Sequence, residues 1–210
     1  HELRTPITNL SLYLDLLEKG KPERRPQYTT ILRRQVTRLT TMLEDIMNIS
    51  RLDMGKIKLN LMALDVNGVV QEVVARFENQ TNDTVVLLTE YQQDMPLIFG
   101  DKKQITQILT NLLNNAVTYT QDGFIRIATS WKTEQKQVCI SLEDTGIGIP
   151  PLELAHVFER FYRASNVSQS TLPGTGLGLS LVKELVDMHH GEIEITSELK
   201  LPFRSLHADA

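Results

Sequence analysis

The chain has 210 residues, of which 41% are hydrophobic and 23% are charged, and this ordinary globular composition excludes a wholly disordered protein. Lys and Arg total 22 against 26 for Asp and Glu, and the net charge of −4 argues against a protein that coats nucleic acid, because such domains are usually basic. Cys139 is the single cysteine, so no internal disulfide can form, and no apolar run approaches the roughly 20 residues that a membrane helix needs.

Residues 1–54 have the apolar spacing of two long helices joined by a short loop. Apolar residues recur at steps of three and four in residues 1–19 and again from about residue 27 to 54, which is the spacing of a heptad face. One glycine and two prolines in residues 20–26 predict the break between the helices. The two apolar faces consist of Leu3, Ile7, Leu10, Leu14 and Leu17 in the first helix and of Leu32, Val36, Leu39, Leu43 and Ile46 in the second.

Two antiparallel helices enclose little core, so this hairpin should leave an apolar seam open. We predict that a second copy closes the seam, which gives a homodimer with a four-helix bundle. The alternative, in which the seam packs against the rest of the same chain, stays open at this point.

From Gly55 onward the apolar period changes, and strands are interleaved with helices. The patterns predict strands at 56–66, 84–92, 123–131, 137–143 and 192–196, and helices at 67–80 and 177–189. A further helix should begin after Asp101, an N-cap with Gln104 three residues on, and turn Ile105, Ile108, Leu109, Leu112 and Leu113 inward. The mixture predicts an α+β fold, an α/β sandwich with helices on one face of the sheet. We expect a hairpin domain at 1–54, a linker at 55–64 and the sandwich domain at 65–210.

Two asparagines of the helix predicted to begin after Asp101 are candidate ligands for a metal ion. Asn111 and Asn115 are four residues apart and share one helical face, where amide oxygens can hold a hydrated Mg²⁺. A solvated helix face is the alternative for this pair taken alone.

A glycine-rich turn, Asp144 to Pro150, follows an apolar strand. Gly146 and Gly148 let the backbone turn and a flat ligand approach closely, and the Asp144 carboxylate can accept a hydrogen bond from an exocyclic amine. An ordinary turn explains this segment equally well when it is taken alone.

A second glycine-rich run, residues 174–179, precedes the apolar 177–189 helix, and the N–H groups at a helix start can bind phosphate. Residues 165–173 before it are polar and do not form a strand, so a Rossmann fold is excluded and a mobile lid is expected. Arg163, just before this lid, could reach a terminal phosphate.

These motifs in this order, together with the opening His-Glu-Leu-Arg-Thr-Pro, resemble the sensor histidine kinases of two-component signalling from His1 to about Ser197. The related gyrase, heat-shock-ninety and mismatch-repair ATPases share the asparagine and DxGxG motifs but lack the histidine hairpin. The resemblance implies that 1–54 is a dimerisation and histidine-phosphotransfer hairpin and that 65–210 is a GHKL-type ATP-binding domain.

The resemblance also implies roles for single residues. His1 is the phosphoacceptor, Glu2 its base, and Thr5 the residue that helps to position water for dephosphorylation of the partner. Asn111 and Asn115 are the ligands of Mg²⁺ and phosphate. The remaining nucleotide-binding set is Tyr119, Asp144, Gly146, Gly148, Ile149, Arg163, Gly174, Thr175, Gly176, Leu177 and Gly178.

The implied function is autophosphorylation of His1 from Mg-ATP, followed by phosphotransfer to an aspartate on the receiver domain of a response regulator. A phosphatase activity toward the regulator stays open, as do two alternatives: a non-catalytic dimeric module that binds nucleotide or a partner, and an ATPase of the related group. Two departures motivate the non-catalytic module: Thr118 stands where relatives often carry lysine, and residues 199–210 only loosely match the closing strand. His190 stands where glycine is usual, and we expect it to tolerate a left-handed turn at little cost.

The chain begins on histidine and not on methionine, so we expect a fragment. It should be the cytoplasmic portion of a parent anchored in the inner membrane through segments that are absent here. We expect no nucleic-acid partner.

Overall fold

A computed structural model describes residues 3–54, 58–78, 84–168 and 174–199 of the chain. The chain divides into two compact units, residues 1–57 and residues 58–210. Within the described residues, no helix is both long and apolar enough to cross a membrane.

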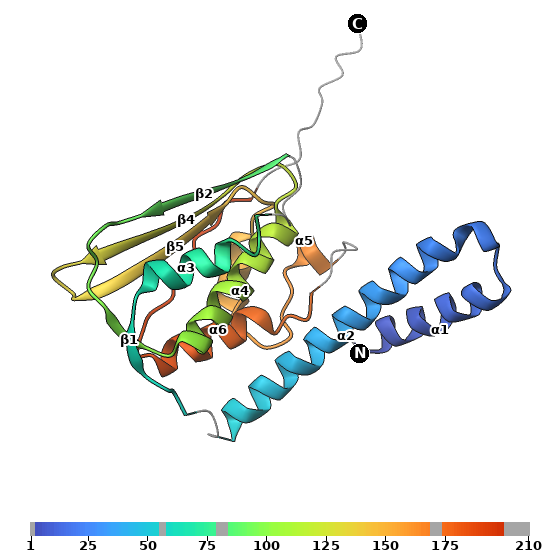
Figure 1. Ribbon diagram of the computed structural model, residues 1–210, viewed down its shortest axis with the longest axis horizontal. Helices are drawn as coiled ribbons and strands as arrows, with labels where there is room; N and C mark the ends of the chain where they lie inside the picture. The colour runs from blue at the N-terminus through green and yellow to red at the C-terminus, as the bar shows by residue number, and fades with distance from the viewer. Residues whose placement is uncertain (1–2, 55–57, 79–83, 169–173, 200–210) are drawn as a thin grey trace, which may run out of the picture. The chain divides into compact units, whose positions relative to one another are not determined.

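The first unit is a hairpin of two helices that lie side by side (Figure 1). Helix α1 (Arg4–Lys19) is followed by the short 3₁₀ helix η1 (Pro22–Arg24) and by α2 (Arg25–Asp53). The predicted break is confirmed over residues 20–24, since α2 already begins at Arg25. Pro26 lies in the first turn of α2, where its missing N–H costs no helical hydrogen bond. The rings of Tyr13 and Tyr28 pack across the hairpin, with centroids 6.0 Å apart.

The second unit contains a three-stranded mixed sheet in the order β2 (Val85–Tyr91), β4 (Gly123–Lys132), β5 (Gln137–Asp144). Strand β4 is parallel to β2 and antiparallel to β5. A separate antiparallel pair joins β1 (Met62–Leu64) to β3 (Ile98–Gly100). The predicted strands at 84–92, 123–131 and 137–143 are confirmed. Of the one predicted at 56–66, the described residues 58–66 form a strand only over 62–64, and β3 was not predicted.

Helices α3 (Val66–Val74), α4 (Lys102–Tyr119) and α6 (Gly178–Met188) lie on one face of the three-stranded sheet (Figure 1), so the predicted sandwich is confirmed. Successive strand residues point to opposite faces, and Ile125 and Ile127 of β4 both point into the core. The predicted inward positions Ile105, Leu109 and Leu113 of α4 are buried, whereas Ile108 and Leu112 are only half-buried. The most deeply buried members of this core, each at most 1% exposed, are Val70, Val73, Leu109, Leu113, Ile125 and Ile127.

The predicted strand over 192–196 is wrong. Residues 191–199 are described, and they form neither helix nor strand. Ile193 and Ile195 are half-buried while the neighbouring glutamates are exposed, so the alternation that predicted a strand is real. It lacks backbone pairing: the segment is held instead by a side chain, because the N–H of Ile149 donates to Oγ of Ser197 at 2.9 Å.

Asp101 is the N-cap of α4, as predicted, and only 6% of it is exposed. Its Oδ1 accepts hydrogen bonds from the N–H groups of Lys103 (2.9 Å) and Gln104 (3.1 Å), and its Oδ2 accepts one from the N–H of Asn60 (2.9 Å). A capping box would have Gln104 pair with the N–H of Asp101, but this N–H donates to Nε2 of His189 at 3.2 Å. We call Asn60, Asp101 and His189 the Asp101 anchor, because it joins the segment before β1, the start of α4 and the end of α6.

Helix α6 ends in a Schellman motif whose left-handed residue is His190, with φ of 55°. The N–H of His190 donates to the carbonyl of Asp187 (2.9 Å), and the N–H of Gly191 donates to that of Val186 (3.0 Å). The left-handed turn that we expected histidine to tolerate in place of glycine is therefore present.

We expect Asp101→Ala to lower the free energy of unfolding by about 2 kcal/mol, because it removes the cap and leaves the N–H of Asn60 without an acceptor. Urea unfolding followed by the fluorescence of Trp131, the single tryptophan of the chain, measures this in the second unit. The matched control is Lys102→Ala, which removes an exposed ion pair with Glu72 and should cost less than about 1 kcal/mol. Equal losses in the two variants would contradict the anchor.

The same anchor gives the stability a pH dependence. Burial raises the pKa of Asp101, but the N–H groups of Asn60, Gln104 and Lys103 together outweigh it and hold the pKa below its ordinary value of 3.8. A carboxyl with a lowered folded-state pKa contributes stability that is present above its unfolded pKa and lost as the pH falls through the folded value. The stability difference between the wild type and Asp101→Ala should therefore shrink below pH 3.8.

Candidate functional site

The polar face of α4 carries the two predicted asparagines one turn apart. Asn111 and Asn115 are both half-buried, while Leu109 and Leu113 on the other face are in the core. Among the described residues, the side-chain amide nitrogen of Asn111 is buried and has no hydrogen-bond partner. An unpaired buried polar group costs about 1–3 kcal/mol, so this amide is available to a ligand.

The same amide fits a magnesium–phosphate group. The oxygen and nitrogen of an asparagine amide are distinguished only by their partners, so the unpaired position can equally present the oxygen. Within the described residues, no three His, Cys, Asp or Glu side chains gather as a metal-ligand set. A cation bound here would therefore take amide oxygens, phosphate oxygens and water, which are ligands that suit Mg²⁺.

The turn after β5 is fixed to the end of α4. The N–H of Gly146 donates to Oδ1 of Asp144 (2.8 Å), and the N–H of Ile147 donates to the carbonyl of Tyr119 (3.3 Å). The first bond orients the exposed Asp144 carboxylate. The second brings the turn beside Tyr119, another of the residues predicted to bind the nucleotide.

Gly148 has a left-handed backbone, with φ of 70°, and a Cβ there would overlap the backbone of Glu198. Its carbonyl accepts a hydrogen bond from Nδ2 of Asn166 (2.8 Å). The next residue, Ile149, is bound to Ser197 as described above. Residues far along the chain therefore close one side of the turn. Asn166 and Ser197 were not predicted as site residues, because no motif in the sequence around them indicates this role.

Tyr119, Arg163 and Gly174 come together from three separate segments. A Cβ on Gly174 would lie 3.3 Å from the hydroxyl oxygen of Tyr119 and 3.7 Å from Nε of Arg163. Burial raises the pKa of the Tyr119 phenol, and the positive charge of Arg163 opposes that rise. We call these three residues the Tyr119 cluster; it places a cation and a hydroxyl beside the predicted phosphate-binding run.

The glycine-rich run leads into α6 through a tight backbone contact. Gly176 (φ 68°) and Phe161 (φ 65°) are both left-handed, and the N–H of Phe161 donates to the carbonyl of Gly176 at 2.9 Å. A Cβ on Gly176 would lie 2.6 Å from the carbonyl carbon of Phe161. Only glycine fits here, and the contact joins the two ends of the segment that contains Arg163.

The remaining residues of the run have distinct surroundings. Leu177 is 2% exposed and is therefore a core residue, and its N–H donates to Oγ1 of Thr175 at 3.1 Å. Helix α6 begins at Gly178, and no side chain among the described residues caps its N-terminus. Uncapped N–H groups at a helix start are suited to phosphate.

The remaining predicted residues lie either on the first unit or outside the described residues. Thr5 is exposed on α1, in the first unit. His1 and Glu2 lie outside the described residues, as does 169–173 of the expected lid, whereas residues 165–168 form the short helix α5 (Ser165–Ser168).

Comparisons with known proteins agree with this arrangement. Residues 1–55 match the His Kinase A (phospho-acceptor) domain, and residues 100–204, half of the chain, match the histidine kinase-, DNA gyrase B- and HSP90-like ATPase family. The chain is 31% identical over 201 residues to the sensor protein kinase WalK of Staphylococcus aureus strain MRSA252. That match covers 92% of this chain and 32% of WalK, so the chain spans about a third of the length of this relative.

Two solved structures are similar. Full-length ShkA in complex with AMPPNP has a TM-score of 0.72 at 27% identity, over 95% of this chain and 42% of ShkA. The Acinetobacter baumannii histidine kinase AdeS has a TM-score of 0.69 at 28% identity, over 90% of this chain and 86% of that one.

We expect Gly176→Ala to lower the free energy of unfolding by at least about 2 kcal/mol, because the new Cβ meets the Phe161 backbone and alanine disfavours this φ. Gly178→Ala is the matched control, since a Cβ there has no neighbour within 4 Å and alanine favours a helix by up to about 1 kcal/mol. Urea unfolding followed by Trp131 fluorescence distinguishes them. Similar stabilities would show that the Phe161–Gly176 contact does not constrain the backbone.

Proposed function

The chain belongs to the sensor histidine kinases, and from that premise we propose that it is a kinase core that moves the γ-phosphate of ATP to His1 and then to a response regulator. Residues 1–54 act as the dimerisation and phosphotransfer hairpin, 55–64 as a linker, and 65–210 as the ATP-binding domain. The observation that carries the proposal is the unpaired Asn111 amide on the helix that ends at the Tyr119 cluster. The AMPPNP complex of ShkA supports the choice of nucleotide.

Adenine is read by the turn after β5. The Asp144 carboxylate, oriented by the N–H of Gly146, accepts a hydrogen bond from the exocyclic amine. Gly146, Gly148 and Ile149 form the floor, where the absence of Cβ atoms at the two glycines lets the backbones of Tyr119 and Glu198 pack closely against the turn.

The phosphates are held by α4 and by the glycine-rich run before α6. Asn111 and Asn115 present amide oxygens to Mg²⁺, which when bound neutralises phosphate charge. The backbone N–H groups of residues 174–178, including those of Thr175 and Leu177, donate to the phosphates at the start of α6. Arg163 binds the γ-phosphate.

Phosphoryl transfer then takes place on His1. An imidazole nitrogen attacks the γ-phosphorus, the bond to the bridging oxygen breaks, and ADP leaves. Glu2 accepts the imidazole proton, which keeps the nitrogen nucleophilic. The phosphate passes to an aspartate of a receiver domain that docks on the hairpin, and Thr5 orients water when that aspartyl phosphate is hydrolysed.

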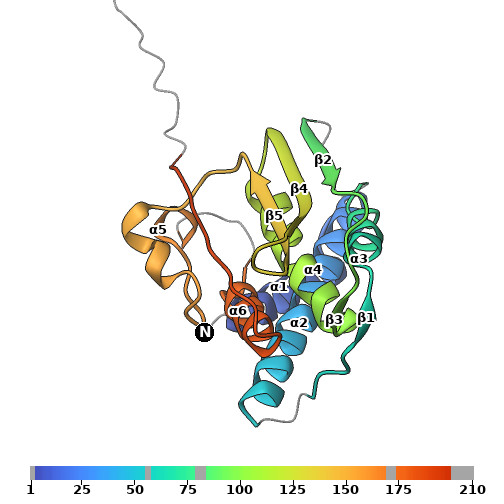
Figure 2. The same cartoon turned by 90° about the vertical axis from the view of Figure 1, so that its left-hand side faces the viewer.

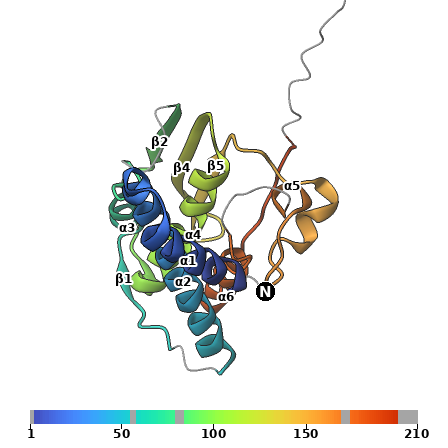
Figure 3. The ribbon, with the colours of Figure 1, turned by 90° about the vertical axis from the view of Figure 1, so that its right-hand side faces the viewer.

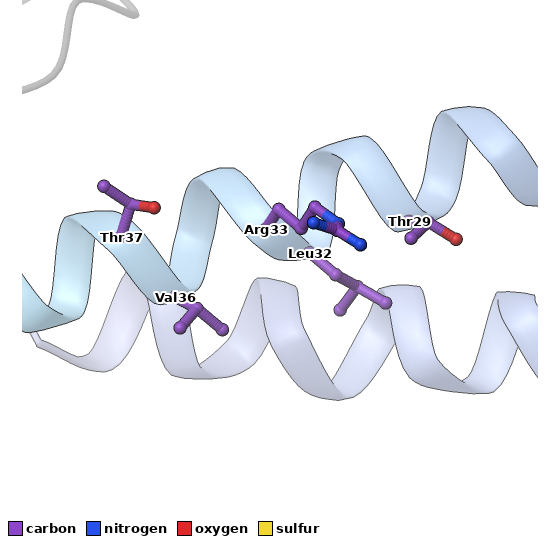
Figure 4. A pocket seen from close by; sticks show the side chains of 5 residues that line it. All are labelled: Thr29, Leu32, Arg33, Val36 and Thr37. Atoms are coloured by element: carbon purple, nitrogen blue, oxygen red, sulfur yellow. The ribbon is translucent and has the colours of Figure 1, made fainter.

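An exposed apolar seam on the hairpin supports a homodimer. Figure 4 shows an open groove on α2, lined by Thr29, Leu32, Arg33, Val36 and Thr37, with Leu32 and Val36 on the same side of the helix. Val36, Leu43 and Met47 of α2 are 53%, 54% and 51% exposed at steps of seven and four residues. A four-helix bundle would bury this face against its copy in a second chain.

We expect Val36→Glu to weaken dimerisation at least about a hundredfold, because the change acts on both copies and each buried valine contributes about 1.5–3 kcal/mol. Sedimentation equilibrium measures the dissociation constant. Arg34→Glu, exposed on the opposite side of α2, is the control and should leave it nearly unchanged. A monomeric wild type would overturn the dimer, as would a Val36→Glu dimer of wild-type affinity.

We expect His1→Gln to abolish incorporation of ³²P from γ-labelled ATP into the protein, because glutamine lacks the nucleophilic nitrogen. Nucleotide affinity, measured by calorimetry with AMPPNP, should stay within about twofold of the wild type, since His1 does not bind nucleotide in this proposal. Labelling that survives the substitution would assign the phosphate to another residue.

A further inference from the structure

Glu153, which no sequence motif marks, is bonded to both sides of Arg163. It lies in the 3₁₀ helix η2 (Pro151–His156), ten residues before Arg163. Its Oε2 accepts hydrogen bonds from the Tyr162 hydroxyl (3.1 Å) and from the N–H of Ser165 (2.8 Å), and its Oε1 accepts one from Oγ of Ser165. One carboxylate therefore fixes the residue before Arg163 and the residue two after it.

The three hydrogen bonds to the Glu153 carboxylate, which we call the Glu153 clamp, are charge-assisted. The hydroxyl and N–H of Ser165 lower the pKa of Glu153, and the Tyr162 hydroxyl adds to the effect. The carboxylate is therefore ionised at neutral pH, and hydrogen bonds to an ionised acceptor are shorter and stronger than neutral ones.

The segment that Glu153 holds has no sheet to support it. In Figures 2 and 3 the orange stretch around α5 stands apart from the strands β2, β4 and β5. Backbone and side-chain hydrogen bonds also hold this segment, through Phe161–Gly176 at one end and Asn166–Gly148 at the other. Arg160 forms an ion pair with Glu184 (2.6 Å), and the rings of His156 and Tyr162 are in contact. Close to Arg163 itself, Glu153 accepts hydrogen bonds from the residues on both sides of it.

We propose that Glu153 is a positioning residue for Arg163: by binding Tyr162 and Ser165 it holds the Arg163 guanidinium in the Tyr119 cluster. Arg163 has Nε 3.7 Å and Cζ 3.9 Å from the position of a Cβ on Gly174, so its guanidinium faces the start of the glycine-rich run. The inference rests on the proposed function, in which Arg163 binds the γ-phosphate. Glu153 itself touches no substrate and acts through the backbone of 162–165.

The test compares a nucleotide that has a γ-phosphate with one that lacks it. We expect Glu153→Ala to weaken AMPPNP binding about tenfold and ADP binding less than twofold, because only the γ-phosphate contact depends on Arg163. Glu153→Gln keeps an acceptor oxygen and should recover part of the loss. Glu159→Ala, which removes an exposed bond to Nδ1 of His156, is the matched control and should bind both nucleotides as the wild type does.

A double-mutant cycle separates positioning from general structural support. Arg163→Ala should remove the preference for AMPPNP, and adding Glu153→Ala to it should cost nothing further. Equal loss of AMPPNP and ADP affinity in Glu153→Ala would overturn the inference, and so would additive losses in the cycle.

A nucleotide-free readout keeps this inference distinct from the proposed function. Amide hydrogen exchange at Ser165 should speed up in Glu153→Ala and not in Glu159→Ala, with Trp131 fluorescence confirming that each variant is folded. A wild type without preference for AMPPNP would overturn the proposed function together with this inference. A preference that Arg163→Ala removes and Glu153→Ala keeps would overturn the positioning role alone.

Discussion

Four hydrogen bonds meet at Asp101, and they fix the start of α4 and the end of α6, two helices that each carry candidate nucleotide residues away from this anchor. Helix α4 runs from this anchor to Tyr119, through Asn111 and Asn115. Helix α6 ends at the anchor through His189, while its start at Gly178 follows the glycine-rich run. The arrangement separates a well-bonded structural end from the end that we propose binds the ligand, which is the condition for holding functional groups at fixed distances.

The ligand-binding end has features that cost stability. The Asn111 amide is buried without a partner among the described residues, and Phe161 has a left-handed backbone that a bulky residue rarely adopts. Such strain persists where surrounding contacts enforce it, and it gathers at functional sites. Here the Phe161–Gly176 bond, the Glu153 clamp and the Tyr119 cluster enforce it, beside the residues that we propose bind the nucleotide.

Local patterns predicted the parts of the fold that local physics determines. The apolar periods of α1, α2 and α4, the cap at Asp101 and the strands β2, β4 and β5 follow from residues close together in the sequence. Contacts between distant segments escaped prediction: His189 takes the place of the Gln104 side chain at the cap, and β3 is three residues long and gains its partner from β1. Residues 192–196 alternate like a strand yet pair with no strand in the described part of the chain, because alternation reports burial and not pairing.

The candidate site likewise contains residues that the sequence indicated and residues that only the structure shows. Glycines and asparagines marked the turn after β5, the face of α4 and the run before α6, since close approach and helical spacing can be seen in the sequence. Glu153, Asn166 and Ser197 are not marked by any sequence pattern. Each acts through hydrogen bonds to residues well separated from it in the chain, and only the folded structure brings these residues together.

Transfer of phosphate to a histidine is tested most directly by the chemical stability of the labelled protein. The chain would be incubated with γ-³²P-labelled ATP and Mg²⁺, and the label measured on the protein and as free phosphate after treatment with acid and with alkali. We expect label on the protein that acid removes and alkali leaves in place, because a phosphoimidazole is acid-labile and base-stable. Free phosphate without a protein adduct would identify an ATPase, and the absence of both would identify a binding module; either result would contradict histidine phosphorylation.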